Sequence, residues 1–595
     1  MRFLPTTIEE LKHLKRDSFD IILITGDAYV DHPSFGAALI GRLLEHHGFT
    51  VGIIAQPDWR SVSDFKKLLR PTLFFGITAG NLDSMLAHYS SNKIPRKTDD
   101  YSPGSKSGKR PDRATIVYAN RIKELFKDSL IVIGGIEASL RRLCHYDFWQ
   151  DSLRRSILLD SRADILVYGM GEHQTVEIAR RLKNGEPIEN LHNIKGTCVA
   201  RKELNVSEHY IHLPSYEEVK DDKNKFAEAF KIFYQENDPL RGKTLVQKHA
   251  NIYVIQNPPA LPLEQKELDG IYELPFTRRY HPSYENAGGI KALQTVKFSI
   301  TSHRGCLGSC SFCTIAAHQG RIIQSRSQES ILREVKKLTE DKDFKGTITD
   351  IGGPTANMYM ADCDIQRTYG NCKNKDCLLP AICKNLKLGD RESIKLLKKV
   401  RTTPGIKHVF VSTGVRYDLC LADKQLAYLK ELCAHHISGQ LKVAPEHTEH
   451  SILTIMNKPS FKTYEQFLKV YGEINKSLNK KQYLVQYFIA SHPGCTLSDM
   501  LKLALYIKGL GYYLEQVQDF VPTPMTISSC MYYTGKNPFT MKNVYVPRLR
   551  EERRMQRALL QFRNKENYRY VYKALMILER NDLVGKENRC LIREK

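Results

Sequence analysis

The chain has 595 residues, of which 42% are hydrophobic and 26% are charged, a balance that excludes disordered and fibrous classes for the chain as a whole. Its net charge of +23 makes RNA a candidate partner, although a solvated basic surface explains the same charge. Apolar runs are too short for a membrane-spanning helix, and acidic residues stand where a secretory signal needs apolar ones. We therefore expect a cytoplasmic protein with no membrane partner.

Residues 1–202 alternate apolar strands with amphipathic helices. A helix is predicted over 37–47, and strands are predicted over 19–26, 51–57, 72–78, 130–138 and 165–172. This alternation is typical of a doubly wound parallel sheet, which binds ligands at the carboxyl ends of its strands. We take 1–202 as an N-terminal α/β domain.

Two later segments lack periodicity. Residues 91–113 are rich in Pro, Gly, Ser and basic residues, and we predict a mobile basic loop there. Such a loop is either a plain solvated insertion or part of a surface for RNA. Residues 203–292 are charged and interrupted by Pro and Gly, which predicts a linker that wraps between domains.

A second alternation occupies residues 293–525. Helices such as 328–338 and 496–508 separate six predicted strands, at 296–303, 346–353, 408–415, 438–445, 483–493 and 514–522. Six β/α units predict an open (β/α)6 partial barrel, whose functional groups lie at the C-terminal ends of its strands.

Three cysteines follow the first barrel strand with the spacing Cys-x3-Cys-x2-Cys: Cys306, Cys310 and Cys313. Cysteine clusters in cytosolic chains are typical of metal or catalytic sites, and thiolates bind iron–sulfur clusters and zinc. A four-iron cluster held by three cysteines keeps one iron open to a ligand. The alternative is a zinc site with a distant fourth ligand, which usually shows paired Cys-x2-Cys units.

Glycines and polar residues follow the later strands at the same predicted end of the barrel. Gly352 and Gly353 follow the second strand, where the missing Cβ lets backbone carbonyls approach a ligand. Ser412 and Arg416 follow the third strand, and Glu446 ends the fourth. Each is compatible with an ordinary turn, but together they predict one polar rim around a site.

Four further cysteines lie within 21 residues: Cys363, Cys372, Cys377 and Cys383. They form a Cys-rich insertion at 363–383, for which we predict a closed metal site that holds zinc or a second iron–sulfur cluster. Four free thiols are the alternative, although they would be open to oxidation. The other seven cysteines are predicted to be small buried hydrophobes.

Residues 526–595 are predicted as a small, basic, mainly helical domain. Residues 541–595 hold 15 Lys and Arg against 7 Asp and Glu, with helices predicted over 548–562 and 567–585, the second ending at Gly585. Tyr568, Tyr570 and Tyr572 lie among basic residues, which suits stacking on unpaired RNA bases. They equally suit packing of the last helix on the barrel.

The cysteine triplet, with Phe312 before its last member, resembles the radical S-adenosylmethionine (SAM) signature. Five phrases extend this resemblance to the YgiQ family of radical SAM proteins, over residues 19–584: GDAYVDHPSFGAALIGRLLE, IGGIEASLRR, RGCLGSCSFC, GGPTANMY and KVAPEHTE. The resemblance implies a [4Fe–4S] cluster on the triplet and a flavodoxin or ferredoxin-type electron donor. It also implies SAM contacts by Phe312, the two glycines and the polar rim. Pro354 replaces the acidic residue that usually follows the glycines. No catalytic residue or substrate is implied.

The N-terminal sheet resembles the cobalamin-binding domains of other radical enzymes, whose Asp-x-His-x-x-Gly motif ligates cobalt. Here His32 directly follows Asp31, and three residues separate it from Gly36. We therefore expect no cobalt ligation by His32 and a repurposed domain. The leading hypothesis is a radical SAM enzyme that acts on RNA or another macromolecule. The alternatives are a cobalamin-dependent radical SAM methyltransferase and a non-catalytic iron–sulfur protein that binds RNA or assists assembly.

Overall fold

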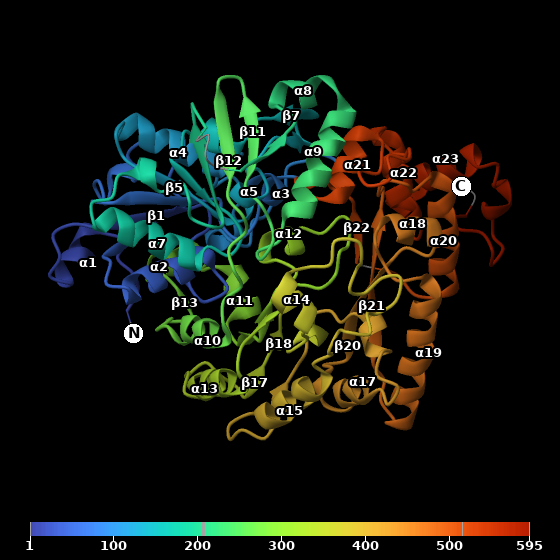
Figure 1. Ribbon diagram of the computed structural model, residues 1–595. Helices are drawn as coiled ribbons and strands as arrows, with labels where there is room; N and C mark the ends of the chain where they lie inside the picture. The colour runs from blue at the N-terminus through green and yellow to red at the C-terminus, as the bar shows by residue number, and fades with distance from the viewer. Residues whose placement is uncertain (1, 205–208, 515, 594–595) are drawn as a thin grey trace.

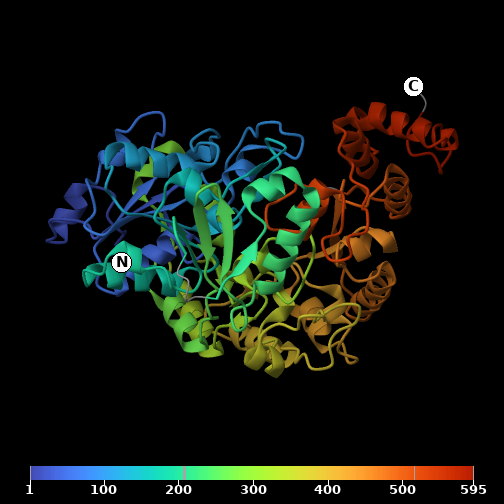
Figure 2. The same ribbon diagram turned by 45° about the horizontal axis from the view of Figure 1, so that its top comes forward.

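The computed structural model describes residues 2–204, 209–514 and 516–593. An α/β layer forms the N-terminal half, a β/α barrel forms the middle, and the last helix, residues 568–577, lies at the barrel edge far from the N-terminal sheet (Figures 1 and 2). Within the described ranges, no helix combines the length and the apolarity that a membrane crossing requires.

A nine-stranded sheet organises the N-terminal half, in the order β10-β11-β12-β9-β8-β5-β4-β1-β3. Its strands are β1 (Ile21–Thr25), β3 (Val51–Ala55), β4 (Phe74–Thr78), β5 (Ile131–Ile133), β8 (Ile165–Val167), β9 (Thr197–Arg201), β10 (Ile211–Leu213), β11 (Leu245–His249) and β12 (Ile252–Gln256). The five strands from β3 to β8 are parallel, which confirms the predicted doubly wound sheet. Strand order reverses between β1 and β4, where such sheets bind ligands.

Helices cover both faces of this sheet. Alternate side chains of β1 point to opposite faces: Ile21 and Leu23 join the core that includes α2, and Ile22 and Ile24 join the core that includes α4. The helices of this half are α1 (Ile8–His13), α2 (Gly36–His46), α3 (Ser84–His88), α4 (Ala114–Leu125), α5 (Gly135–Ser139), α6 (Ile157–Ser161), α7 (Glu172–Lys183), α8 (Tyr216–Asp221), α9 (Lys223–Glu236), α10 (Gln265–Glu273) and α11 (Lys291–Val296).

The segment 203–292 differs from the predicted linker, because it adds β10, β11 and β12 to the N-terminal sheet. These strands lack the alternation of apolar and polar residues that predicts a strand, because several of their polar side chains point inward. Gln247 accepts a hydrogen bond from the amide of Cys144 at 2.8 Å, and Gln256 accepts one from Arg142 at 2.8 Å. These bonds satisfy the buried amide oxygens, so the strands tolerate side chains that look solvent-exposed.

The basic loop at 91–113 also differs from its prediction as a mobile segment. Arg110 is fully buried, and its guanidinium lies 3.1 Å from Asp27 and 2.9 Å from Asp99. Near the start of the loop, the Ser91 hydroxyl donates to Asp519 of the barrel at 2.6 Å. Buried ion pairs therefore anchor a segment whose composition alone indicates solvent exposure.

Six strand regions form the barrel at the predicted places, which confirms the (β/α)6 architecture. Parallel pairing joins β14 to β18, β17 to β19, β20 to β21 and β21 to β22. The strands are β14 (Ser299–Thr301), β15 (His303–Arg304), β16 (Gln324–Ser325), β17 (Thr347–Ile348), β18 (Asp350–Gly352), β19 (His408–Val409), β20 (Gln440–Glu446), β21 (Tyr483–Ala490) and β22 (Val517–Asp519). Glu515, inside the sixth predicted strand, lies outside the described residues.

The larger barrel helices line its outer side (Figure 1). The helices of this region are α12 (Ile315–Gln319), α13 (Gln328–Thr339), α14 (Asp364–Tyr369), α15 (Asp390–Arg401), α16 (Tyr417–Cys420), α17 (Ala427–Glu431), α18 (His450–Ile455), α19 (Phe461–Ser477) and α20 (Leu497–Gly509). The helix α13 begins at the predicted residue because its N-cap, Ser327, accepts the amide of Ser330.

The C-terminal part is helical, as predicted, with α21 (Ile527–Thr534), α22 (Arg550–Leu560) and α23 (Tyr568–Ile577). The last helix ends well before Gly585, which is a correction to its predicted length. Glu579 adopts a left-handed φ of 55°, and the amide of Arg580 bonds back to the Leu575 carbonyl at 2.8 Å. This reversal closes the helix without a glycine. The seven scattered cysteines are all buried, as predicted.

Candidate active site

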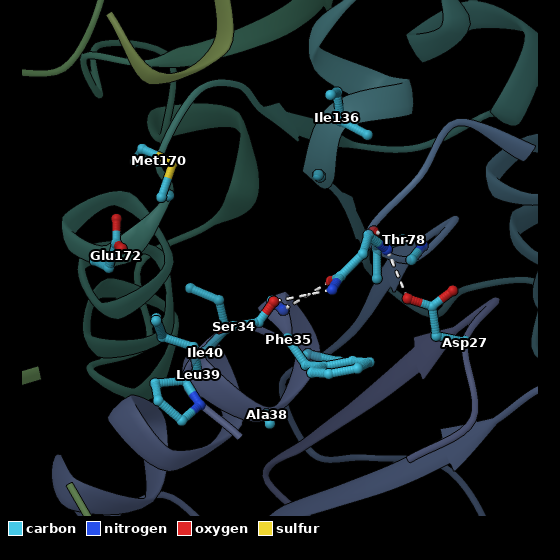
Figure 3. A pocket seen from close by; sticks show the side chains of 18 of the residues that line it. Asp27, Ser34, Phe35, Ala38, Leu39, Ile40, Thr78, Ile136, Met170 and Glu172 are labelled. Carbon is cyan, nitrogen blue, oxygen red and sulfur yellow. Dashed lines mark hydrogen bonds between the residues drawn. The ribbon is translucent and has the colours of Figure 1, made fainter. Parts of the chain in front are cut away.

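A cavity of about 610 Å³ lies between the N-terminal sheet and the barrel. One wall consists of turns that follow β1, β4, β5 and β8 together with the first residues of α2, and Figure 3 shows side chains of this wall around the cavity. The other wall follows the barrel strands β14 and β18. The cavity therefore lies at the strand-order reversal of the sheet and at the ligand-binding end of the barrel.

Two buried acids, Asp27 and Glu172, line the N-terminal wall. Asp27, just after β1, accepts the amide of Asn81 at 2.6 Å and faces Arg110. Burial raises the pKa of Asp27 to about 6, although Arg110 acts in the opposite direction. The side chain of Asn81 donates to the carbonyl of Ser34 at 2.9 Å and so ties the turn after β4 to the start of α2 (Figure 3).

The barrel wall carries an acid that is held by the third strand region. Asp350 accepts the amides of Ser412 and Thr413 at 2.7 and 3.0 Å, and it also accepts the Thr413 hydroxyl. Asp350 and Thr413 line the cavity, but Ser412 does not, because its hydroxyl donates to the Thr349 carbonyl at 2.7 Å. The cavity residue of this turn is therefore Thr413, which the sequence reasoning missed.

Both glycines of the Gly352-Gly353 turn are required by close packing. A Cβ on Gly353 would lie 2.6 Å from Cε1 and from the carbonyl oxygen of His303, and one on Gly352 would lie 2.6 Å from the Thr413 hydroxyl. The Gly352 carbonyl accepts the amide of Ser302 at 2.7 Å. Both glycines line the cavity, whereas Ser412, Arg416 and Glu446 of the predicted polar rim do not.

The three cysteines of the triplet lie together in the loop after β15. A Cβ on Gly308 would lie 3.4 Å from the Cys306 sulfur and 3.8 Å from the Cys310 sulfur, so this glycine keeps the space between two thiols open. Burial raises the pKa of Cys313 to about 12, and the neighbouring Cys310 thiol adds to the shift. Three thiols in one loop match the number of protein ligands of an iron–sulfur cluster that keeps one iron open, and the positive irons of such a cluster deprotonate the sulfurs.

Arg416 lies beside this loop. Its guanidinium binds Asp418 through two bonds of 3.1 and 2.6 Å, and one of its nitrogens is 3.9 Å from the Cys310 sulfur. Burial disfavours the cation, but Asp418 outweighs burial and raises the pKa of Arg416. The structure thus places a permanent positive charge against the cysteine loop.

Two further predicted site residues are Phe312, which belongs to the cysteine loop, and Glu446. Phe312 packs edge-to-face on His492 with ring centroids 6.0 Å apart. Glu446 is buried at the end of β20 with a left-handed φ of 66°, and Lys458 Nζ lies 3.7 Å from its carboxylate. Burial raises the pKa of Glu446. SAM contacts by Phe312, Gly352, Gly353, Ser412, Arg416 and Glu446 stay predictions.

Two features of the cavity escaped the sequence reasoning. Arg304 of β15 forms a buried ion pair with Glu172 at the start of α7, and it donates to the Tyr272 hydroxyl at 3.1 Å. His318 of α12 lies 3.2 Å from the Ser139 hydroxyl, and burial lowers the pKa of His318 to about 4. These contacts join residues of the two walls that are far apart in the sequence, so no local spacing of residues predicts them.

His32 is buried outside the cavity wall, and its Nδ1 atom accepts the amide of Ser34 at 3.1 Å. Its neighbours Pro33 and Ser34 line the cavity instead. The histidine that stands nearest to a cobalamin motif thus points away from the space that a ligand would fill.

The four cysteines of the insertion line a second, smaller cavity of about 50 Å³ together with Asn371 and Asp376. Among the described residues, no three His, Cys, Asp or Glu side chains converge on a point as ligands of a single ion do, and this holds for both cysteine groups. A metal at the insertion stays a prediction.

The basic tail is less available to RNA than its composition indicates. Arg553 is buried and donates to the Phe520 carbonyl at 2.7 Å, and Arg557 donates to the Val517 carbonyl at 2.5 Å. Arg554 donates to the Tyr570 hydroxyl at 3.2 Å. These arginines tie α22 to the last barrel strand and to α23. The rings of Tyr568 and Tyr570 pack on the core, whereas Tyr572 is half exposed.

Three family models match successive parts of the chain. Residues 3–299 match the family described as Radical SAM N-terminal, residues 300–507 match the Radical SAM superfamily, and residues 515–594 match a domain of unknown function, DUF3362. Two solved structures resemble the chain at low identity. TsrM, a radical S-adenosylmethionine methyltransferase from Kitasatospora setae, has a TM-score of 0.47 at 14% identity, over 85% of this chain and 75% of its own. OxsB, a cobalamin-dependent S-adenosylmethionine radical enzyme, has a TM-score of 0.46 at 11% identity, over 88% and 56%.

Two relatives match almost the whole chain. A UPF0313 protein of Clostridium botulinum is 55% identical over 592 residues, which is 100% of this chain and 93% of the relative. A UPF0313 protein of Methanocella arvoryzae is 55% identical over 587 residues, 99% of this chain and 97% of the relative. The predicted radical SAM class is confirmed by the superfamily match. The chain therefore belongs to the UPF0313 family, and it is a radical SAM enzyme.

Proposed function

We propose that the chain cleaves SAM reductively at a [4Fe–4S] cluster held by Cys306, Cys310 and Cys313. We further propose that the reaction acts on a ligand in the interdomain cavity. One observation carries this proposal: the cysteine loop, the Gly352-Gly353 turn and the cavity share one end of the barrel. A reaction that starts at the loop therefore has the interdomain cavity at the same end of the barrel.

A [4Fe–4S] cluster held by Cys306, Cys310 and Cys313 would supply the electron that breaks a carbon–sulfur bond of SAM, which gives methionine and a 5′-deoxyadenosyl radical. The chain's own residues hold and enclose the reactants. Gly308 leaves room between the thiols, and Arg416 places a cation beside Cys310. Asp350 offers a fixed carboxylate at the cavity wall, because three hydrogen bonds from Ser412 and Thr413 orient it.

The size of the cavity supports a small-molecule substrate or cofactor over RNA. A volume of about 610 Å³ falls within the roughly 300–1,000 Å³ that is usual for small-ligand sites. The tail gives less support to RNA, since Arg553 and Arg557 are engaged by backbone carbonyls. The electron donor of the proposed reaction is a flavodoxin or ferredoxin-type protein.

A second candidate is cobalamin-dependent methyl transfer, and the place of the cavity favours it. The space lies at the strand-order reversal of the N-terminal sheet and continues onto the barrel wall, so one large ligand would touch both walls. His32 lies outside this wall, so a cobalamin here would not be ligated by His32. Extraction of cobalamin from protein purified anaerobically from cells supplied with cobalamin would support this candidate. Protein that is free of cobalamin after such a purification would exclude it.

The main proposal is tested by anaerobic reconstitution with iron and sulfide, followed by reduction in the presence of SAM. We expect release of methionine and 5′-deoxyadenosine in equal amounts, and loss of both products in the C306A/C310A/C313A variant. The C433A variant is the control, because Cys433 is buried in the barrel core away from the cavity. Equal release of 5′-deoxyadenosine by the triple variant would overturn the proposal.

A further inference from the structure

The cysteine-rich insertion touches the radical loop directly. The Ser309 hydroxyl, between Cys306 and Cys310 in the chain, hydrogen-bonds to the carboxylate of Asp376. Arg321 lies 3.7 Å from the same carboxylate. The Asp376 carboxylate of the insertion thus contacts the radical loop through Ser309, and Arg321 pairs with the same carboxylate.

A small hydrophobic core is shared by the two groups. Leu307 of the radical loop is buried in the same cluster as Leu378 and Leu386 of the insertion. Cys306, Cys377 and Cys383 pack against this cluster from its edge. The insertion is therefore not a solvent-exposed loop, because two of its cysteines pack against the same hydrophobic cluster as the loop of the triplet.

The N-terminal half fixes the other side of the insertion. Asp238, which is buried, accepts the amide of Asn371 at 2.6 Å and its side-chain nitrogen at 2.8 Å. A Cβ on Gly370 would lie 2.3 Å from the Asp238 carboxylate, so only glycine fits there. Gln366 donates to Asn371 at 2.6 Å and to the Arg321 carbonyl at 3.1 Å. This network positions the segment that contains Cys363 and Cys372 without using any thiol.

These anchors leave the four thiols as the unused donors around one hollow. All four cysteines line the cavity of about 50 Å³, with Cys363 buried at its inner end and Cys372 exposed at its outer end. Eight, four and five residues stand between successive cysteines, and the paired Cys-x2-Cys units of many zinc sites are missing from this sequence segment. Four thiolates around one hollow match the number of protein ligands of a closed iron–sulfur cluster.

We propose that Cys363, Cys372, Cys377 and Cys383 bind a second iron–sulfur cluster, packed against the loop that carries Cys306, Cys310 and Cys313. Four thiolates occupy every protein-ligand position of such a cluster, so it has no open iron and does not bind SAM. The proposal goes beyond SAM cleavage. It rests on the proposed function only where it takes the neighbouring loop as the first cluster.

The experiment is a pair of reciprocal variants, C306A/C310A/C313A and C363A/C372A/C377A/C383A, reconstituted anaerobically beside the unmodified chain and C433A. We expect each multiple variant to retain iron and acid-labile sulfide in a 1:1 ratio, with its own electron paramagnetic resonance signal after reduction. The unmodified chain and C433A should show both signals and more than four irons per chain. Circular dichroism verifies that each variant folds.

Three results would overturn the second cluster: a folded C306A/C310A/C313A variant that binds no metal, the same variant with zinc and no sulfide, or an unmodified chain with four irons or fewer. The last measurement keeps the test decisive if a multiple variant fails to fold. The proposed function fails separately, since a chain with both signals that releases no 5′-deoxyadenosine would refute SAM cleavage and leave the second cluster standing.

Discussion

The two walls of the interdomain cavity come from two parallel β/α sheets, yet they are chemically different. The N-terminal wall offers glycine turns, the apolar start of α2 and two buried acids, Asp27 and Glu172. The barrel wall offers a fixed carboxylate, two imidazoles and, just behind it, the three thiols beside Arg416. The difference indicates that the barrel holds the reactive groups, whereas the N-terminal sheet shapes the space for a ligand.

The largest expected effect is the loss of SAM cleavage when a thiol of the cysteine triplet behind the barrel wall is removed. Replacement of Cys310 by Ala removes one of three ligands, so we expect SAM cleavage to fall below detection and the absorbance of the cluster near 400 nm to be lost. The matched control is C144A, a buried thiol of the N-terminal half that lies outside the cavity. Cleavage by C310A at the rate of C144A would show that the thiols are not the reactive part of the barrel wall.

A glycine from each wall gives the next comparison. In Gly353→Ala the new Cβ would meet His303 at 2.6 Å, and part of that contact is backbone, so the turn must shift. A shift of the reacting groups by about 1 Å typically lowers the rate about 100-fold. In Gly36→Ala the new Cβ meets no atom within 4 Å, so we expect an unchanged rate. The rate of 5′-deoxyadenosine release checks both. Equal rates in the two variants would mean that the Gly-Gly turn does not position the reactants.

The sequence predicts each wall only as far as its signal is local. Alternating apolar residues place β1, and the cysteine spacing places the triplet, because both depend on neighbours along the chain. Burial of Arg110 against Asp27 depends on a residue 83 positions away, and the inward glutamines of β11 and β12 look like surface residues. The choice between Ser412 and Thr413 depends on the direction of one turn, which composition does not encode.

The contact between the walls gives the third comparison. Glu172 and Arg304 are both almost fully buried where α7 meets β15. The substitution Glu172→Gln leaves a buried guanidinium without its counter-charge, which costs about 3–5 kcal/mol. The exposed pair of Arg333 and Glu273 is the control, since breaking a surface pair by Glu273→Gln costs about 0–1 kcal/mol. Melting temperatures of the two variants measure the contrast. An E172Q variant as stable as E273Q would show that the walls meet without help from this pair.

The smallest expected effect concerns the pH dependence of stability, and here the walls have opposite signs. The pKa of His318 is lowered to about 4 by burial, below the value near 6.5 of an unfolded histidine. The unfolded chain therefore binds a proton that the folded chain excludes between these values. The contribution of His318 is present above pH 6.5 and is lost as the pH falls toward 4.

Asp27 acts in the other direction, because burial raises its pKa to about 6, above the value near 3.9 of an unfolded aspartate. The folded chain holds a proton that the unfolded chain releases, so this contribution is present below pH 4 and is lost as the pH rises through 6. Each group changes the slope by at most one proton, which is about 1.4 kcal/mol per pH unit. Melting temperatures from pH 4.5 to 6.5 should therefore rise less steeply with pH in His318→Gln and more steeply in Asp27→Asn. If the slope of melting temperature against pH changes in the same direction in both variants, then burial does not favour the neutral form of both His318 and Asp27.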